Sequence, residues 1–372
     1  MGWRTGLPCT GSGASRARRL AWLALGAAGL ALGCGGADDQ SSPHLAGVDR
    51  TTHVACDLYA ATGGSDSAPG SRSRPLRTAQ RLVAALDRGQ TGCFRDGTFT
   101  FSLLELSTPS VTLAPYQDEA VTLEGELKVL PDGVGSTIQG LKLNGASGDN
   151  QIGPRIYAHD VTLRDNEITN DHTSICVSVG RYYSSPPPRG VVIERNRIHD
   201  CGELPSTNMD HGVYIVEARD TVIRDNWIYG NTDRGVQLYP DAHGSTVTGN
   251  VIDSNGEGIV FGGTALNVSS DNLVTGNVVS NSTRGWNVYS NTPGPPASGN
   301  VLRRNCLWAG DAAPDFDSDG GVETSSPAFT SRANRVVDPL YVDRDDHDYT
   351  LSPESKCPLT REPGFPALNG AS

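Results

Sequence analysis

Residues able to do acid–base chemistry gather in a short stretch of this chain, Met209 to Ile215, which reads MDHGVYI. It holds Asp210, His211 and Tyr214. An imidazole can serve as a general base near neutral pH, and a tyrosine hydroxyl can give a proton back. Arginine can clamp a carboxylate through paired hydrogen bonds. Further candidates follow along the chain, among them Asp233, Arg234, Gln237, Tyr239, Glu257, Arg284, Asn287 and Tyr289.

A repeat explains how residues so far apart could meet. The steps from one repeated asparagine to the next are 30, 30, 24, 27 and 28 residues, with an aliphatic residue three places before each asparagine and another two places after it. This strand-like spacing predicts a parallel β solenoid with one coil per repeat. Asn tolerates a left-handed backbone at a bend, and stacked Asn side chains can hydrogen-bond between coils. The repeats are VTLRDNEI (161–168), VVIERNRI (191–198), TVIRDNWI (221–228), STVTGNVI (245–252), NLVTGNVV (272–279) and NVLRRNCL (300–307).

A column of glycines predicts where the polar side chains lie. Gly212, Gly235, Gly258 and Gly285 each open a short strand. We expect the residue before each glycine, and the second and fourth residues after it, to point outward. These places hold His211, Tyr214 and Val216; Arg234, Gln237 and Tyr239; Glu257, Val260 and Gly262; Arg284, Asn287 and Tyr289; and, in the coil before them, Thr173, Cys176 and Ser178.

Two long inserts, 180–190 and 201–209, flank this polar ladder and predict the wall of a groove for a chain-like sugar. A plainer interpretation is also open, because solenoid faces are polar anyway and Asp210 and Asp233 could simply pair with His211 and Arg234. On the functional interpretation, the catalytic candidates are His211, Tyr214, Arg234, Tyr239 and Asp233, and the substrate-binding candidates are Asp210, Gln237, Glu257, Arg284, Asn287 and Tyr289.

The N-terminus has the features of an export signal. Residues 1–19 contain four arginines and no acidic residue, and the apolar run over 20–33 is too short to span a bilayer. The sequence ALGC resembles a bacterial lipobox, which implies cleavage after residue 33, lipidation of Cys34 and a place in the cell envelope. An ordinary secretory signal is the alternative. The small polar residues of 34–55 predict a flexible tether.

The composition indicates which classes of partner and which disulfide bonds to expect. The net charge of −12 argues against nucleic acid. Six cysteines remain after Cys9 and Cys34, and an even number in an exported protein suggests disulfides. Pairing of neighbours is the simplest arrangement, although sequence leaves the connectivity open: Cys56–Cys93, Cys176–Cys201 and Cys306–Cys357. We expect a monomer.

Both ends of the mature chain resemble a known family. Residues 57–86 hold a GSD…PG…P loop and an apolar stripe of helical spacing, and residues 336–357 read VVDPLYVDRDDHDYTLSPESKC. They resemble the ends of bacterial right-handed β-helix proteins of the pectate-lyase-like superfamily. The resemblance implies an all-β, single-stranded right-handed parallel β-helix over 56–310 with an N-terminal capping helix, followed by a C-terminal capping segment and tail over 311–372. Lyases, glycosidases, epimerases, adhesins and tailspikes share this scaffold, so the resemblance does not fix the function. The stripe consists of Leu76, Ala79, Leu82, Val83 and Leu86.

Three functions stay open on this scaffold, and none requires a cofactor. The favoured one is a polysaccharide lyase or epimerase acting on a uronate-containing glycan, with His211 as base, Tyr214 or Tyr239 as acid and Arg234 as clamp. Residues 143–355 contain no lysine, which disfavours lysine-based variants. MDHGVYI also resembles the Asp-Pro-His-Asp signature of alginate epimerases. The alternatives are a glycoside hydrolase, using Asp233 with Asp210 or Glu257, and a non-catalytic glycan-binding module.

An acidic segment near the C-terminus suggests a metal. Asp315, Asp317 and Asp319 alternate and are followed by Gly320, as in the first half of a calcium loop. A calcium-stabilised loop and a solvated acidic turn fit this pattern about equally.

Overall fold

The computed structural model describes residues 54–148, 152–294, 296–310, 320–323 and 327–358, all within one compact unit, Leu45–Ser372. The export signal, Cys34 and the candidate calcium ligands Asp315, Asp317 and Asp319 lie outside these residues. What the sequence indicates for them stays a prediction. No helix in the described part of the chain is long and apolar enough to cross a membrane.

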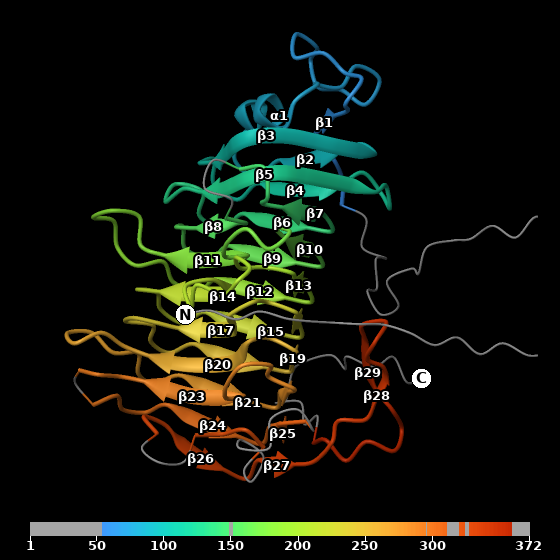
Figure 1. Ribbon diagram of the computed structural model, residues 1–372. Helices are drawn as coiled ribbons and strands as arrows, with labels where there is room; N and C mark the ends of the chain where they lie inside the picture. Colours follow the sequence, from blue (N-terminus) through green and yellow to red (C-terminus); the bar gives the residue numbers. More distant parts are fainter. Residues whose placement is uncertain (1–53, 149–151, 295, 311–319, 324–326, 359–372) are drawn as a thin grey trace, which may run out of the picture. The chain divides into compact units, whose positions relative to one another are not determined.

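The described chain winds into a stack of parallel coils, as predicted (Figure 1). The strands of the first sheet pair in chain order, one per coil. They are β1 (Leu58–Ala60), β2 (Thr91–Phe94), β4 (Thr112–Pro115), β6 (Thr137–Gln139), β9 (Thr162–Arg164), β12 (Val192–Glu194), β15 (Val222–Arg224), β18 (Thr246–Thr248), β21 (Leu273–Thr275), β24 (Val301–Arg303) and β26 (Thr330–Arg332).

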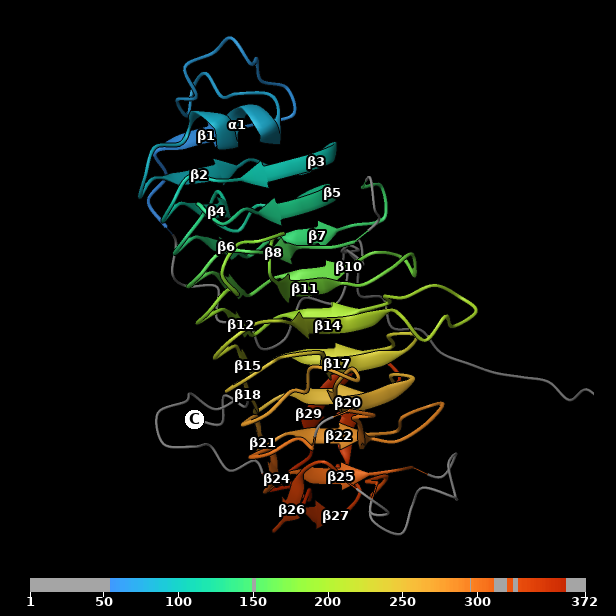
Figure 2. The same cartoon turned by 90° about the vertical axis from the view of Figure 1, so that its left-hand side faces the viewer.

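Two further faces begin at the long strand β5 (Val121–Val129), which pairs with β3 (Gly97–Leu106) and with the first strand of each face. We call them the second and third sheets. The second contains β7 (Lys142–Asn144), β10 (Glu167–Thr169), β13 (Arg197–His199), β16 (Trp227–Tyr229), β19 (Val251–Asp253), β22 (Val278–Ser280), β25 (Cys306–Trp308) and β27 (Arg335–Val336). The third, which Figure 2 turns towards the viewer, contains β8 (Arg155–Ile156), β11 (Val177–Gly180), β14 (His211–Val216), β17 (Arg234–Leu238), β20 (Glu257–Gly262) and β23 (Val288–Asn291).

One continuous core fills the coils. The repeated aliphatic residues before and after each asparagine are 0–1% exposed, so the predicted inward positions are confirmed. Each such burial contributes about 1.5–3 kcal/mol of hydrophobic stabilisation. At the N-terminal end the short helix α1 (Ala79–Ala85) buries Ala79, Leu82 and Val83 against the first strands, and the Thr78 hydroxyl caps it by accepting from the Arg81 amide.

The repeated asparagines form a hydrogen-bonded ladder inside the bend between the first and second sheets. The left-handed residue is the one before each asparagine, as at Asp165 (φ 58°) and Asp225 (φ 57°), so the expectation that Asn itself takes that backbone is wrong. Asn is needed for its amide, which bonds the next coil. The Nδ2–Oδ1 distances are 2.9–3.0 Å for Asn166–Asn196, Asn196–Asn226, Asn226–Asn250, Asn250–Asn277, Asn277–Asn305 and Asn305–Asn334.

Replacing Asn226 by Ala is expected to lower the free energy of unfolding by at least about 2 kcal/mol. The change leaves the buried Asn196 amide and Ile193 carbonyl without their partners, and each such group costs about 1–3 kcal/mol. Urea unfolding followed by circular dichroism measures the loss. Asn334→Ala, at the half-buried end of the ladder, is the matched control and should cost less because water can reach the freed groups. Equal losses would contradict the ladder's role.

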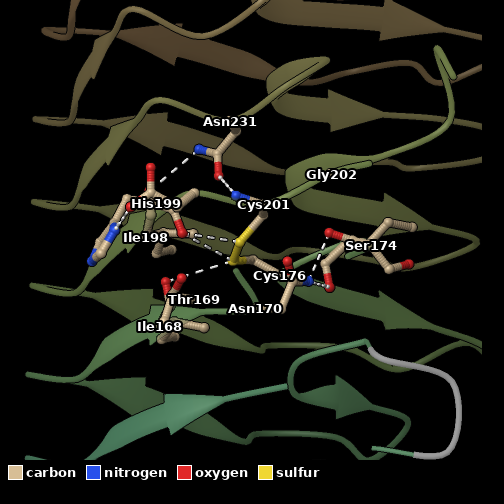
Figure 3. The surroundings of a disulfide bond; sticks show 12 residues. Ile168, Thr169, Asn170, Ser174, Cys176, Ile198, His199, Cys201, Gly202 and Asn231 are labelled. Atoms are coloured by element: carbon tan, nitrogen blue, oxygen red, sulfur yellow. Dashed lines mark hydrogen bonds and ion pairs between the residues drawn. A yellow bond between two sulfur atoms is a disulfide. The ribbon is translucent and has the colours of Figure 1, made fainter. Parts of the chain in front are cut away.

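All three predicted disulfides are present: Cys56–Cys93, Cys176–Cys201 and Cys306–Cys357. Cys176–Cys201 lies in the core, where Asn231 accepts from the Cys201 amide at 3.2 Å (Figure 3). Cys306–Cys357 ties the coil of β25 to the chain beyond the hairpin of β28 (Tyr341–Asp343) and β29 (Asp348–Leu351). This hairpin covers the second sheet, where the Tyr349 ring packs on Trp227 and Tyr229.

Candidate functional site

The third sheet brings the central polar residues together on its outer side. Its register pairs His211 with Arg234 and Arg234 with Glu257. It also pairs Tyr214 with Gln237. The alignment predicted for these three coils is therefore confirmed. We call the following set the polar ladder: His211, Tyr214, Arg234, Gln237, Tyr239, Glu257 and Tyr289.

The alignment predicted for the outer coils is wrong by two residues. Val260 pairs with Tyr289, not with Asn287, and Ser178, not Cys176, pairs with Tyr214. The C-terminal coil has two more residues before its strand, which shifts Arg284 out of the column of His211.

Asn287 is consequently buried, and the expectation that it faces outward is wrong. Its amide donates to the carbonyls of Trp308 (2.9 Å) and Gly320 (2.8 Å), and its oxygen accepts from Ser282. Cys176 likewise lies in the core, in its disulfide. The Asn287 and Cys176 side chains therefore stabilise bends of the solenoid.

The glycine column has a steric cause. A Cβ at Gly212 would lie 2.8 Å from the Asn231 amide nitrogen, and one at Gly258 would lie 2.2 Å from the Asn287 carbonyl oxygen. Only glycine fits where the chain enters these strands. Each strand can then present His211 or its equivalent on the outer side.

Arg234 is the centre of the ladder's hydrogen bonds. Its guanidinium donates to the Asn208 carbonyl (2.9 Å) and side chain (2.6 Å) and to the Tyr289 hydroxyl (3.0 Å). It also pairs with Glu257 at 3.0 Å, and Tyr289 donates to the same carboxylate at 2.8 Å. Because these contacts hold the Arg234 side chain at 6% exposure, it supplies a fixed positive charge beside the site.

His211 is buried beside this charge. Burial, with Arg234 acting in the same direction, lowers its pKa to about 3, so the imidazole is neutral at physiological pH. Its Nδ1 is buried, and the Asp210 backbone interacts with the ring. The ring meets Tyr214 edge-on, with centroids 5.3 Å apart. The Gln237 amide lies close to the same ring.

Two tyrosines of the ladder, Tyr214 and Tyr289, are held in their protonated form. Burial raises the pKa of Tyr214 to about 12, and the neighbouring Tyr239 acts in the same direction. Burial also raises the pKa of Tyr289 to about 12. The ring of Tyr239 lies over Gly262, where a Cβ would be 2.6 Å from its Cδ2 atom. The ladder therefore offers phenol hydroxyls as donors at neutral pH.

Asp233 fastens the insert 201–209, the site loop, to the sheet. Its carboxylate accepts from the Ser206 hydroxyl, from the Asp210 amide at 2.9 Å and from Arg284 at 2.7 Å. Burial opposes ionisation of Asp233, but these hydrogen bonds lower its pKa. The suggested pairing of Asp233 with Arg234 is thus wrong, since its cation is Arg284.

Asp210 directly follows the site loop. Its carboxylate accepts from the Thr207 hydroxyl at 2.9 Å and from the Ser174 hydroxyl at 3.4 Å. The suggested ion pair with His211 is absent among the described contacts. Asp210 and Asp233 therefore hold the site loop in place, and this loop sets Asn208 against Arg234.

Asp233→Ala is expected to release the site loop. The exposed Leu204 (66%) and Met209 (70%) lie in or beside it and would become accessible cleavage sites. Limited proteolysis with mass spectrometry should show at least about tenfold faster cleavage between residues 201 and 210. Asp220→Ala, which removes an exposed carboxylate from another bend, is the control. Unchanged cleavage in Asp233→Ala would mean that other contacts hold the loop.

Sequence reasoning missed the ladder's extension towards the N-terminus. Strand β8 pairs Arg155 with Ser178, and β5 pairs Lys128 with Arg155. Both cations contact Glu126, which is completely buried. These strands precede the first repeated asparagine, so the repeat gave no register for them. The signal in the sequence was the presence of two basic residues, Lys128 and Arg155, and the acidic Glu126 within otherwise apolar strands.

The calcium prediction receives no test from these residues. Among the residues that the structure describes, no group of three or more His, Cys, Asp or Glu side chains is arranged to hold a metal ion. Glu323, next to the acidic segment, accepts from the Ser290 amide and hydroxyl at 2.9 and 3.0 Å.

Comparison with known proteins identifies the fold class. Residues 129–305 match the family described as "Right handed beta helix region", and this part of the chain is a right-handed parallel β-helix. The predicted resemblance is thereby confirmed at the level of the fold. No curated protein sequence matches this chain.

Solved structures of β-helix proteins resemble this chain at low identity. Pectate lyase Pel9A is 13% identical, with a TM-score of 0.56 over 83% of this chain and 92% of that one. A complex of XylC with xylose is 11% identical (TM-score 0.47; 68% and 66% covered). The A-module of the mannuronan C-5 epimerase AlgE6 of Azotobacter vinelandii is 16% identical (TM-score 0.45; 68% and 82% covered). At these identities the similarity shows the fold alone.

Proposed function

We propose that the outer side of the third sheet binds a uronate-containing polysaccharide and that His211 removes the C5 proton, as in lyase or epimerase chemistry. The observation that carries the proposal is the position of a neutral His211 between the Tyr214 ring and the fixed charge of Arg234. An anionic sugar beside the ring would offset that charge and raise the pKa of His211 towards the range of a working base.

In the lyase reaction, the C5 proton passes to His211, the C4–O bond breaks and a C4–C5 double bond forms. Tyr214, protonated because of its raised pKa, gives a proton to the departing oxygen. In the epimerase reaction, the C4–O bond stays intact and C5 takes up a proton on its other face instead. Arg234 favours the anionic intermediate through its charge, while Glu257 and Tyr289 fix its position.

The carboxylates support hydrolysis less well. A hydrolase needs a carboxyl group that is protonated when it meets the substrate. The lowered pKa of Asp233 leaves it ionised, with its oxygens engaged by Ser206, Asp210 and Arg284. Glu257 accepts from Tyr289 and pairs with Arg234.

We further propose export and lipid anchoring through Cys34. The disulfides support an oxidising location outside the cytosol, where such bonds persist. The proposed partners are then an extracellular acidic glycan and, through the lipid alone, a membrane.

The wild-type protein should be assayed on polygalacturonate and on polymannuronate. We expect either a rise in the ultraviolet absorbance of unsaturated uronate, the mark of a lyase, or exchange of the C5 hydrogen with deuterium from heavy water, the mark of an epimerase. New reducing ends without absorbance would overturn the proposal in favour of a hydrolase. Binding without any reaction would overturn it in favour of a glycan-binding module.

A further inference from the structure

The outward column of Tyr214 continues beyond the polar ladder. The register joins Tyr214 to Ser178, Ser178 to Arg155, and Arg155 to Lys128. Parallel strands lie about 4.8 Å apart, which places the backbone of Arg155 about 10 Å from that of Tyr214 along the stack. A chain-like ligand that lies along the stack over Tyr214 also passes Arg155 and Lys128.

Two cations come together at this end of the column. The buried Glu126 carboxylate faces two cations, Arg155 Nε at 3.0 Å and Lys128 Nζ at 3.4 Å. The register sets a second carboxylate, that of the exposed Glu105, beside Lys128 on the next strand, so the formal charges of these four side chains balance. The Lys128 and Arg155 side chains are 17% and 23% exposed, so both reach the surface from a buried stem. Their N–H groups can therefore donate charge-assisted hydrogen bonds to a carboxylate at the surface.

Three tyrosines extend from Arg155. Tyr157 accepts from Arg155 Nη1 at 3.4 Å, and its ring lies 4.9 Å from that of Tyr182. Tyr182 in turn meets Tyr183 edge-on at 4.6 Å, and Tyr183 is 85% exposed. An exposed aromatic ring fixed by its neighbours suits the apolar face of a sugar.

We propose that these residues form a second subsite for an anionic sugar unit, whose carboxylate binds Lys128 and Arg155 and whose ring stacks on Tyr183. The inference rests on the proposed function. It assigns the substrate to the acidic glycans and requires a chain long enough to span from His211 to Lys128.

The test measures affinity for polygalacturonate and for its carboxyl-reduced, neutral form by isothermal titration calorimetry. Lys128→Gln keeps the Arg155–Glu126 pair and should weaken binding of the acidic glycan about tenfold, with little change for the neutral one. Lys142→Gln is the matched control, since Lys142 pairs with Glu167 on the second sheet, and it should change neither.

Tyr183→Asn provides an independent test. Asn tolerates the left-handed backbone of this position (φ 48°), so the fold should be kept. Loss of the ring should weaken both glycans by about five- to tenfold. Val342→Ala, another exposed apolar residue, in the hairpin on the second sheet, should have no effect.

The outcomes separate the two proposals. If the wild-type protein binds neither glycan, the proposed function and the subsite both fall. If it binds the acidic glycan, and Lys128→Gln or Tyr183→Asn binds as tightly as its control, the subsite alone is overturned.

Discussion

His211→Gln is expected to lower turnover of the uronate glycan by about 10²–10⁴-fold, the usual contribution of a general base. Gln can stay hydrogen-bonded within β14, but its amide does not take up a proton at working pH. The affinity for the glycan should change little, because the charge of Arg234 and the rings of Tyr214 and Tyr239 are kept. Turnover and the Michaelis constant, measured on the glycan that the wild-type protein converts, separate the two effects.

The matched control for this substitution is His243→Gln. His243 lies in the same stack, is paired with Asp241 at 2.8 Å and is 30% exposed. The His243→Gln substitution should leave turnover unchanged. Turnover by His211→Gln within a few fold of the wild type would show that the base lies elsewhere.

The second large effect expected is a loss of stability in acid that depends on His211. Its folded-state pKa of about 3 lies below the ordinary value of about 6.5, because burial and Arg234 disfavour the imidazolium. The stabilisation by the neutral ring is therefore complete above about pH 6.5 and is lost as the pH falls towards 3. The loss of this stabilisation between pH 7 and pH 4.5 amounts to about 2–3 kcal/mol of unfolding free energy.

Urea unfolding of the wild type and of His211→Gln at the two pH values measures this contribution. Carboxylates such as Asp233 destabilise both proteins alike in acid, so their effect cancels in the comparison. The wild type should lose about 2–3 kcal/mol more than the variant. Equal losses would mean that acid does not charge a buried His211.

The coil architecture could be predicted from the sequence because every coil needs the same residue types at the same positions. Asn166 and its equivalents bond the coils through their amides, and Gly212 and Gly258 stand where no Cβ fits. Residues that every coil needs at the same position recur in the sequence at a regular spacing. The repeat did not determine the disulfide connectivity, because Cys306–Cys357 joins a coil to the chain beyond the hairpin.

The site could be predicted only where the coils are regular. The three central coils keep one spacing, so His211, Arg234 and Glu257 align as expected. Two extra residues before β23 move Tyr289 into line with Val260 and bury Asn287. Such insertions lengthen a bend without disturbing the core, and the apolar pattern therefore does not reveal them.

Side-chain partners were harder still to predict. Arg284 and Asp233 meet because the site loop folds back over the sheet and supplies Ser206 to both. Asn208 reaches Arg234 in the same way. The path of a loop depends on such polar contacts rather than on a period in the sequence.

The most direct test is a crystal structure of His211→Gln with a bound oligouronate. The account predicts a sugar over Tyr214 and Tyr239, with C5 facing the side chain at position 211 and the chain continuing towards Arg155. An oligosaccharide bound to the first or second sheet, with the outer side of the third sheet empty, would contradict it.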